Sequence, residues 1–229
     1  PAASSKRPEL AGLPFRAVGL SIVFHPTNPF VPTAHENIRF FSSSLDGEEV
    51  WWFGGGFDLT PYFGFEDDCR RWHKSAKNIC EKFDPNIYDE FKKNCDEYFM
   101  IKHRNEPRGV GGLFFDDLNR WPFDDCFEFA KAVNSSFSNE YFAIFKNRSK
   151  HEYSQVEKDF QLYRRGRYVE FNLVYDRGTL FGLQFGGRIQ SILASLPPTV
   201  SWPYQATNVN QLFEKKLMEE FLTVNDWVY

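Results

Sequence analysis

The order of hydrophobic and polar positions divides the chain into a strand-rich beginning, a helical middle and a mixed C-terminal part. Runs of β-branched and aromatic residues, bounded by turn residues, are typical of strands. The triplet Gly54-Gly55-Gly56 is predicted to end one of them. Strands are predicted at 17–25, 37–44, 48–53 and 110–117.

The middle of the chain predicts helices, because its apolar residues recur with a period close to 3.6. One helix is predicted at 66–83, a second from Asp84-Pro85 to about 104, and a third at 122–146. Residues predicted to face the core are Trp72, Ala76, Ile79 and Phe83 in the first, Tyr88, Phe91, Cys95, Tyr98 and Phe99 in the second, and Phe123, Phe127, Ala130, Phe137, Tyr141 and Ile144 in the third.

The C-terminal part mixes both patterns. A polar helix is predicted at about 150–165, and a strand from Tyr168 to Tyr175 follows it. The turn Asp176-Arg177-Gly178 is predicted to join that strand to another at about 179–184, as a β-hairpin. Two last helices are predicted at 188–196 and 209–226.

This order of elements predicts an α+β fold with a large, mainly antiparallel sheet that is flanked by helices on both faces. With 229 residues and no evident linker, the chain is predicted to form a single domain over 1–229, after a loose lead-in at 1–14.

Composition narrows the class of function. The net charge is −4 and no block of Lys or Arg stands out, so nucleic-acid binding is not expected. No apolar run is long enough to predict a membrane span. Aromatic residues make up 18% of the chain, which suits a core and also the walls of a pocket for a large flat ligand. Four cysteines without a CxxC pair are expected to be reduced and buried.

The stretch from His25 to Arg39 is the strongest local candidate for a site. Prolines at 26, 29 and 32 exclude a regular helix between His25 and His35, and Asn37 and Arg39 follow on a predicted strand. Imidazole, amide and guanidinium groups on a stiff scaffold are typical of a polar site. A Pro-rich turn with histidines at the surface explains the same residues equally well.

Other candidate groups have two interpretations each. The glycine clusters lack nucleotide-binding spacing, so they are either strand-end turns or places where the backbone approaches a bulky ligand. Asp58 and Asp116 either cap local turns or point into a site, where Asp58 would take a proton or pair with a ligand N–H group. Arginines in the later half are either a solvated face or a grip on several carboxylates; they include Arg104, Arg108, Arg164, Arg165, Arg167, Arg177 and Arg188.

Four histidines raise the possibility of a metal site. His73 and His103 are predicted to lie on helices, and His25 and His35 on the Pro-rich loop. They have neither carboxylate partners nor the spacing of metal ligands, so a metal site is the less favoured interpretation.

Several long segments closely resemble the oxygen-dependent coproporphyrinogen III oxidase family, and the resemblance extends from about residue 15 onward. The segments are His25 to Phe41, Val50 to Phe65, Lys102 to Asn119, Phe160 to Thr179 and Phe181 to Pro198. Members of this family usually carry a further upstream segment, so the N-terminal part of the family domain is expected to be missing here.

The resemblance implies an activity. It implies oxidative decarboxylation of the ring A and ring B propionates of coproporphyrinogen III to vinyl groups, with O₂ as co-substrate, giving protoporphyrinogen IX in haem biosynthesis. It implies that no organic cofactor is required and that a divalent metal is possible without being favoured. It also implies a homodimer whose interface includes 168–202.

The resemblance also implies roles for individual residues. His35 matches a proton donor, Asp58 a carboxylate that engages pyrrole N–H groups, and Asp176 and Arg177 a pair tied to activity. Substrate-binding positions match Ser21, Asn37, Ile38, Arg39, Gly186, Gly187 and Arg188. Positions that are metal ligands in some bacterial relatives match His25, His35, His73 and His103.

Two rival interpretations stay open. One is a non-catalytic tetrapyrrole carrier, and the other is a metal-dependent oxygenase that uses the histidines. A cytoplasmic location is preferred, while relatives also occur in the mitochondrial intermembrane space and in plastids.

Overall fold

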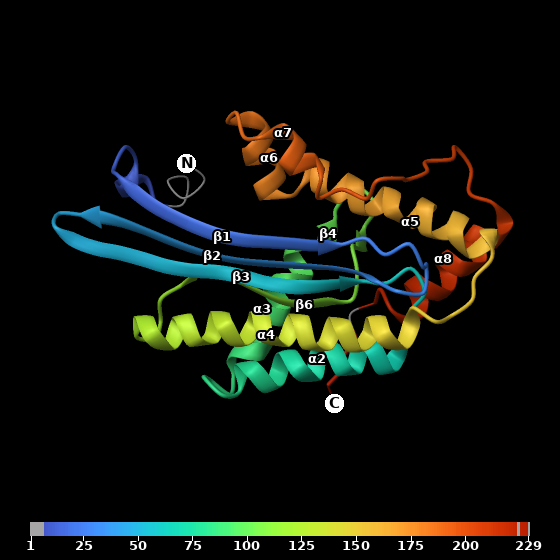
Figure 1. The fold of residues 1–229 in the computed structure, drawn as a ribbon, viewed down its shortest axis with the longest axis horizontal. Helices are drawn as coiled ribbons and strands as arrows, with labels where there is room; N and C mark the ends of the chain where they lie inside the picture. Colours follow the sequence, from blue (N-terminus) through green and yellow to red (C-terminus); the bar gives the residue numbers. More distant parts are fainter. Residues whose placement is uncertain (1–6, 224, 229) are drawn as a thin grey trace.

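The computed structural model describes residues 7–223 and 225–228, and shows an α+β fold (Figure 1). Its main sheet has four antiparallel strands in the order β1-β2-β3-β6. They are β1 (Phe15–Phe24), β2 (Thr33–Leu45), β3 (Glu48–Thr60) and β6 (Gly111–Leu118). The short strands β4 (Met100–Ile101) and β5 (Glu106–Pro107) form a separate pair. The predicted fold class is confirmed.

Helices lie on both sides of the sheet (Figure 1). One side carries α2 (Glu66–Cys80), α3 (Ile87–Tyr98) and α4 (Phe123–Arg148). The other carries α5 (Gln155–Val174), α6 (Arg177–Gln184) and α7 (Ile189–Leu193). The last helix, α8 (Asn208–Glu220), packs beside α5. A short 3₁₀ helix, η1 (Pro8–Leu10), lies within the expected lead-in, of which residues 1–6 lie outside the described part.

The main hydrophobic core lies between the sheet and helices α2, α3 and α4. Trp72, Phe91 and Phe137 are almost fully buried there, as their helical spacing predicts. The prediction was wrong for Phe123 and Phe127, whose exposed fractions are 43% and 46%. The other predicted positions of α4, Ala130, Phe137, Tyr141 and Ile144, are buried, and Cys126, Phe129 and Val133 are buried beside them.

The predicted hairpin after residue 168 is wrong. Residues 155–174 form one continuous helix, α5, which begins at a capping box: Ser154 accepts from the Val156 amide, and Glu157 accepts from the Ser154 amide. Residues 177–184 form α6, and Asp176 caps it instead of turning a hairpin. The residues after Tyr168 mimic a strand because they are largely aromatic, aliphatic and β-branched, although Leu173 and Val174 are exposed on the helix.

Two further local predictions were wrong. β3 continues through the triple glycine to Thr60, so Asp58 lies on a strand and not on a turn. Helix α3 ends at Tyr98, and His103 lies in the turn between β4 and β5, not on a helix. In the described residues, no helix is long and apolar enough to cross a membrane.

Candidate active site

The pairing register of the sheet brings the candidate residues onto one face. His35 pairs with Asp58, Asn37 with Gly56 and Arg39 with Gly54 in the β2–β3 ladder. Ser21 of β1 pairs with Asn37. Residues directly opposite one another in an antiparallel pair point to the same face. Side chains from three stretches of sequence therefore share the face that α5 and α6 cover (Figure 1).

His35, Asp58 and Arg108 form a hydrogen-bonded chain. The Nδ1 atom of His35 lies 3.0 Å from Oδ1 of Asp58, and Nη2 of Arg108 lies 2.8 Å from both carboxylate oxygens. The side chains of Asp58 and Arg108 are each only 2% exposed, whereas that of His35 is 24% exposed. The chain thus runs from the interior to an accessible imidazole.

Aromatic rings enclose the interior end of this chain. The Arg108 guanidinium carbon lies 4.1, 4.5 and 4.6 Å from the ring centroids of Phe99, Tyr168 and Phe171. Asn172 accepts a further hydrogen bond from Nη1 of Arg108, at 2.9 Å. The guanidinium is therefore fixed by ring faces and by hydrogen bonds at once.

Asp58 is ionised in this setting. Burial alone would raise the pKa of Asp58, but the Arg108 guanidinium and the His35 ring hold that pKa below its usual value. An ionised carboxylate only accepts hydrogen bonds, so the His35 Nδ1 atom must carry the hydrogen. Its Nε2 atom is then left to accept or donate a proton elsewhere. The arrangement favours Asp58 as a fixed anion that orients His35 over Asp58 as a proton acceptor.

A second polar group lies further along the same face. Arg39 donates from Nη1 to Asn37 Oδ1 at 2.6 Å and from Nη2 to Asp116 Oδ1 at 2.5 Å. Arg177 donates to the other oxygen of Asp116, Oδ2, at 3.0 Å. A Cβ atom on Gly54 would lie only 2.7 Å from Nε of Arg39. The glycine is therefore needed where the Arg39 side chain crosses β3.

Asp176 has a structural task in α6. Its Oδ2 atom accepts from the Thr179 amide at 2.7 Å as the helix cap, and its Oδ1 atom accepts from the Tyr98 hydroxyl at 2.9 Å. The cap places Arg177 in the first turn of α6. Ile38 points to the opposite face and packs against the main core. Gly186, Gly187 and Arg188 link α6 to α7, and no described hydrogen bond or ion pair joins Arg188 to Arg39, Asp116 or Arg177.

The four histidines do not gather. His25 lies 2.9 Å from the Ser195 carbonyl, and His73 lies 2.8 Å from the Val110 carbonyl. Burial lowers the pKa of both to about 4. His103 contacts Glu170 and Tyr175 in a network between α5 and the β4–β5 turn. Among residues 7–223 and 225–228, no group of three or more His, Cys, Asp or Glu side chains has the geometry of a metal site.

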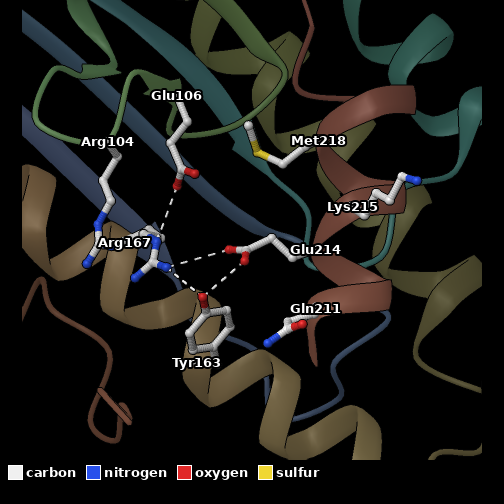
Figure 2. A pocket seen from close by; sticks show the side chains of 8 residues that line it. All are labelled: Arg104, Glu106, Tyr163, Arg167, Gln211, Glu214, Lys215 and Met218. Carbon is white, nitrogen blue, oxygen red and sulfur yellow. Dashed lines mark hydrogen bonds and ion pairs between the residues drawn. The ribbon is translucent and has the colours of Figure 1, made fainter. Parts of the chain in front are cut away.

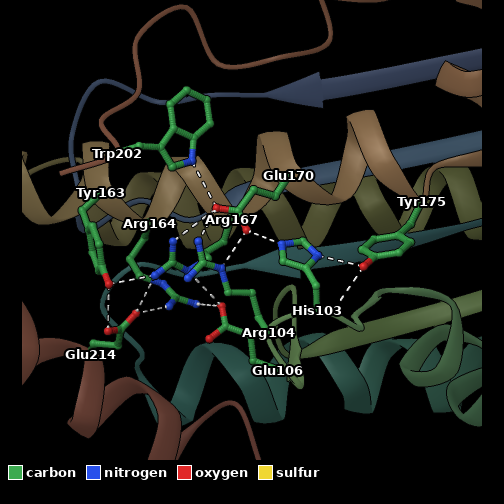
Figure 3. A network of polar contacts seen from close by, with 10 residues as sticks. All are labelled: His103, Arg104, Glu106, Tyr163, Arg164, Arg167, Glu170, Tyr175, Trp202 and Glu214. Atoms are coloured by element: carbon green, nitrogen blue, oxygen red, sulfur yellow. Dashed lines mark hydrogen bonds and ion pairs between the residues drawn. The ribbon is translucent and has the colours of Figure 1, made fainter. Parts of the chain in front are cut away.

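A charged network fastens α8 and the β4–β5 turn to α5, and sequence reasoning missed it. Arg164 pairs with Glu106 and Glu214, and Glu170 accepts from Arg104 and from the Trp202 indole (Figure 3). A cavity of about 480 Å³ lies at its edge (Figure 2). Its lining residues are Arg104, Glu106, Tyr163, Arg167, Gln211, Glu214, Lys215 and Met218. Since each arginine here faces a glutamate, the network is a clamp between helices.

Arg108 and Asp116 complete the candidate site. The sequence shows Arg108 as one arginine among several and Asp116 as one of two adjacent aspartates. Only the fold shows that Arg108 fixes Asp58 and that Asp116 joins two arginines. Neither partner lies within the same element, so the spacing of residues carries no signal for these pairs.

Comparison with known proteins is consistent with this site. The sequence model of the coproporphyrinogen III oxidase family matches residues 1–227. Proteins from three strains of Coxiella burnetii, Dugway 5J108-111, RSA 331 and RSA 493, are each 57% identical over 229 residues. The match covers 100% of this chain and 74% of each relative, and each relative is named oxygen-dependent coproporphyrinogen-III oxidase.

Proposed function

The chain belongs to the coproporphyrinogen III oxidase family, and from that premise we propose that it is an oxygen-dependent coproporphyrinogen III oxidase. It converts the ring A and ring B propionates of coproporphyrinogen III to vinyl groups and gives protoporphyrinogen IX for haem biosynthesis. Each conversion releases CO₂ and passes two electrons to O₂. No prosthetic cofactor is required, since the porphyrinogen is itself electron-rich.

The observation that carries this function is that an oriented histidine, His35, and two neighbouring arginines, Arg39 and Arg177, lie on the same face of the sheet. Coproporphyrinogen III offers pyrrole N–H groups at its centre and four propionate carboxylates at its rim. The Nε2 atom of His35, whose ring the buried Asp58 anion orients, suits the N–H groups, and Arg39 and Arg177 suit the carboxylates. The two groups lie at different places along the site face, on β2, β3 and the start of α6, as a broad ligand with a polar centre and an anionic rim requires.

In this arrangement Asp58 and His35 act together on the proton. Asp58 stays anionic because Arg108 fixes it, and it stabilises positive charge on a pyrrole that is being oxidised. His35, held through its Nδ1 atom, has its Nε2 atom available to take or give a proton near the ring. Arg39 and Arg177 hold a propionate and thereby decide which ring is presented. Ser21, Asn37, Gly186, Gly187 and Arg188 are proposed to complete the substrate contacts. Ile38 is left out, because its side chain packs against the core on the other face of the sheet.

Aerobic turnover tests the proposal. The 229-residue chain is incubated with coproporphyrinogen III under air, the porphyrinogens are oxidised, and the porphyrins are separated by chromatography with fluorescence detection. The Coxiella burnetii relative serves as positive control. Formation of protoporphyrin supports the function. Tight binding of coproporphyrin III without turnover would instead identify a tetrapyrrole carrier.

The protein is also proposed to be a homodimer whose interface includes residues 168–202. Support comes from exposed apolar side chains at the end of α6 and on α7, where Phe185 is 70% exposed, Ile189 52% and Leu193 41%. Such a patch on a single chain is typical of a protein–protein contact. Light scattering after gel filtration measures the mass, and Phe185→Glu is expected to give monomers.

A cytoplasmic location is the preferred proposal. It is supported by the free, buried state of Cys69, Cys80, Cys95 and Cys126, which suits a reducing compartment. Fluorescence microscopy of the tagged protein in its own host tests it.

A further inference from the structure

The Asp116 carboxylate lies between two arginines that are far apart in the sequence. Its Oδ1 atom accepts from Arg39 on β2, and its Oδ2 atom accepts from Arg177 in the first turn of α6. Asp116 itself belongs to β6. One carboxylate therefore ties a helix on the site face to two strands of the sheet.

The geometry brings two like charges close together. Both guanidinium groups lie over the same ring, that of Phe114, at 5.9 and 5.5 Å from its centroid. Without an anion between them, two guanidinium groups at this separation repel each other. With Asp116 the group of three carries a net charge of +1, so the arginines stay together and the group still attracts an anion.

The group is accessible and has unused donors. The exposed fractions of Arg39, Arg177 and Asp116 are 36%, 47% and 22%. A guanidinium has five N–H donors, and the described partners of Arg39 are single oxygens of Asn37 and Asp116. Donors on both arginines are therefore left for a ligand carboxylate, which an arginine pair binds with good geometry.

We propose that Asp116 is a positioning residue for substrate binding, which holds Arg39 and Arg177 side by side as a receptor for one propionate carboxylate. This inference rests on the proposed function, because it takes the ligand to be a porphyrinogen with anionic side chains. Asp116 makes no favourable contact with the propionate, because both groups are carboxylates. It acts through the two arginines, and its own charge opposes the ligand.

Because Asp116 repels the ligand, the proposal predicts that Asp116→Asn changes affinity differently with and without Arg177. A purely structural role predicts no such difference. In the wild-type background, Asp116→Asn releases Arg177 from Arg39, so affinity for the carboxylate falls. In an Arg177→Ala background there is no second arginine to position, and the remaining effect of Asp116 is repulsion of the ligand. There, Asp116→Asn is expected to leave affinity unchanged or to improve it.

The experiment measures the Kd of coproporphyrin III by fluorescence quenching for the wild type, Asp116→Asn, Arg177→Ala and the double variant. Asp117→Asn is the matched control, since it removes the adjacent carboxylate, and Asn tolerates the positive φ of 53° at that position. The uncharged tetramethyl ester of coproporphyrin III is the control ligand. Circular dichroism and thermal melting confirm that each variant is folded.

We expect Asp116→Asn to raise the Kd of coproporphyrin III about tenfold in the wild-type background, which corresponds to about 1.4 kcal/mol. The Kd of the tetramethyl ester and the Kd of the Asp117→Asn variant should change less than about twofold. An unchanged Kd for Asp116→Asn overturns the inference, and so does an equal rise in the Arg177→Ala background. A wild-type chain that binds no coproporphyrin III overturns the proposed function as well.

Discussion

The buried pair of Asp58 and Arg108 gives the sharpest quantitative prediction. Replacing Arg108 with Met keeps most of the side-chain volume between Phe99, Tyr168 and Phe171 but removes the charge. Asp58, at 2% exposure, then keeps only the His35 ring as a described side-chain partner. Leaving one member of a buried pair uncompensated costs about 3–5 kcal/mol.

This loss is large enough to measure directly. For a chain of this size, about 1 kcal/mol shifts the melting temperature by roughly 2–4 °C, so Arg108→Met is expected to melt about 6–20 °C lower. Urea titration followed by circular dichroism gives the free energy of unfolding. Arg120→Met is the matched control, because Arg120 and Glu90 form a similar pair at 42% and 46% exposure. An exposed pair contributes only about 0–1 kcal/mol.

The double variant Asp58→Asn, Arg108→Met separates the charge effect from lost packing. Removing both charges leaves no buried ion without a partner, so the double variant should lose less stability than the sum of the two single variants. If Arg108→Met costs no more than the Arg120→Met control, or if the two losses simply add, the claim that Arg108 fixes an ionised Asp58 is wrong.

Three further predictions concern activity, pH and metal. Asp58→Asn should fold but lose about two to four orders of magnitude in kcat, because the fixed anion beside His35 is gone; near-wild-type kcat would reduce Asp58 to a structural role. Burial raises the pKa of Glu36 from 4.5 to about 7, so folding stability should fall as pH rises between those values, because the unfolded chain gives up this proton first. Glu36→Gln should remove that part of the pH dependence in urea titrations from pH 4.5 to 8, and an unchanged profile would contradict the assignment. Turnover should survive treatment with a strong chelator and confirmed metal depletion, whereas loss of activity that one divalent ion restores would show a metal requirement.

The sequence predicted the sheet and the first helices well because their signals are local. Runs of β-branched and aromatic residues in the strands and a 3.6-residue period in α2 each lie within one element. The later part of α5 was wrongly predicted as a strand, because a short run of aromatic, aliphatic and β-branched residues does not distinguish a helix from a strand. Phe123 and Phe127 were wrongly predicted to be buried. Phenylalanines lie on several sides of α4, so their spacing does not show which side faces the core.

The candidate site shows the same division. The sequence indicates His35, Asn37, Arg39 and Asp58 as candidate site residues, and the register of β2 and β3 gathers them on one face. Their partners were not identified, because Arg108 reaches Asp58 from outside the sheet. Pairings between distant segments depend on how the elements pack, which no spacing within one element encodes.

The triple glycine connects the fold to the chemistry. Gly54 and Gly56 lie on the site face of β3 opposite Arg39 and Asn37, and Gly56 has a φ of +141° that favours glycine. A Cβ atom on Gly54 would collide with the Arg39 guanidinium, which lies across this strand to reach Asp116. Glycine is therefore required in β3 at the position where the Arg39 side chain crosses the strand. A turn at these glycines would have separated Asp58 from Arg39, whereas a continuous strand places the Asp58–His35 pair for the pyrrole centre and the Arg39 cation for the rim along one ladder.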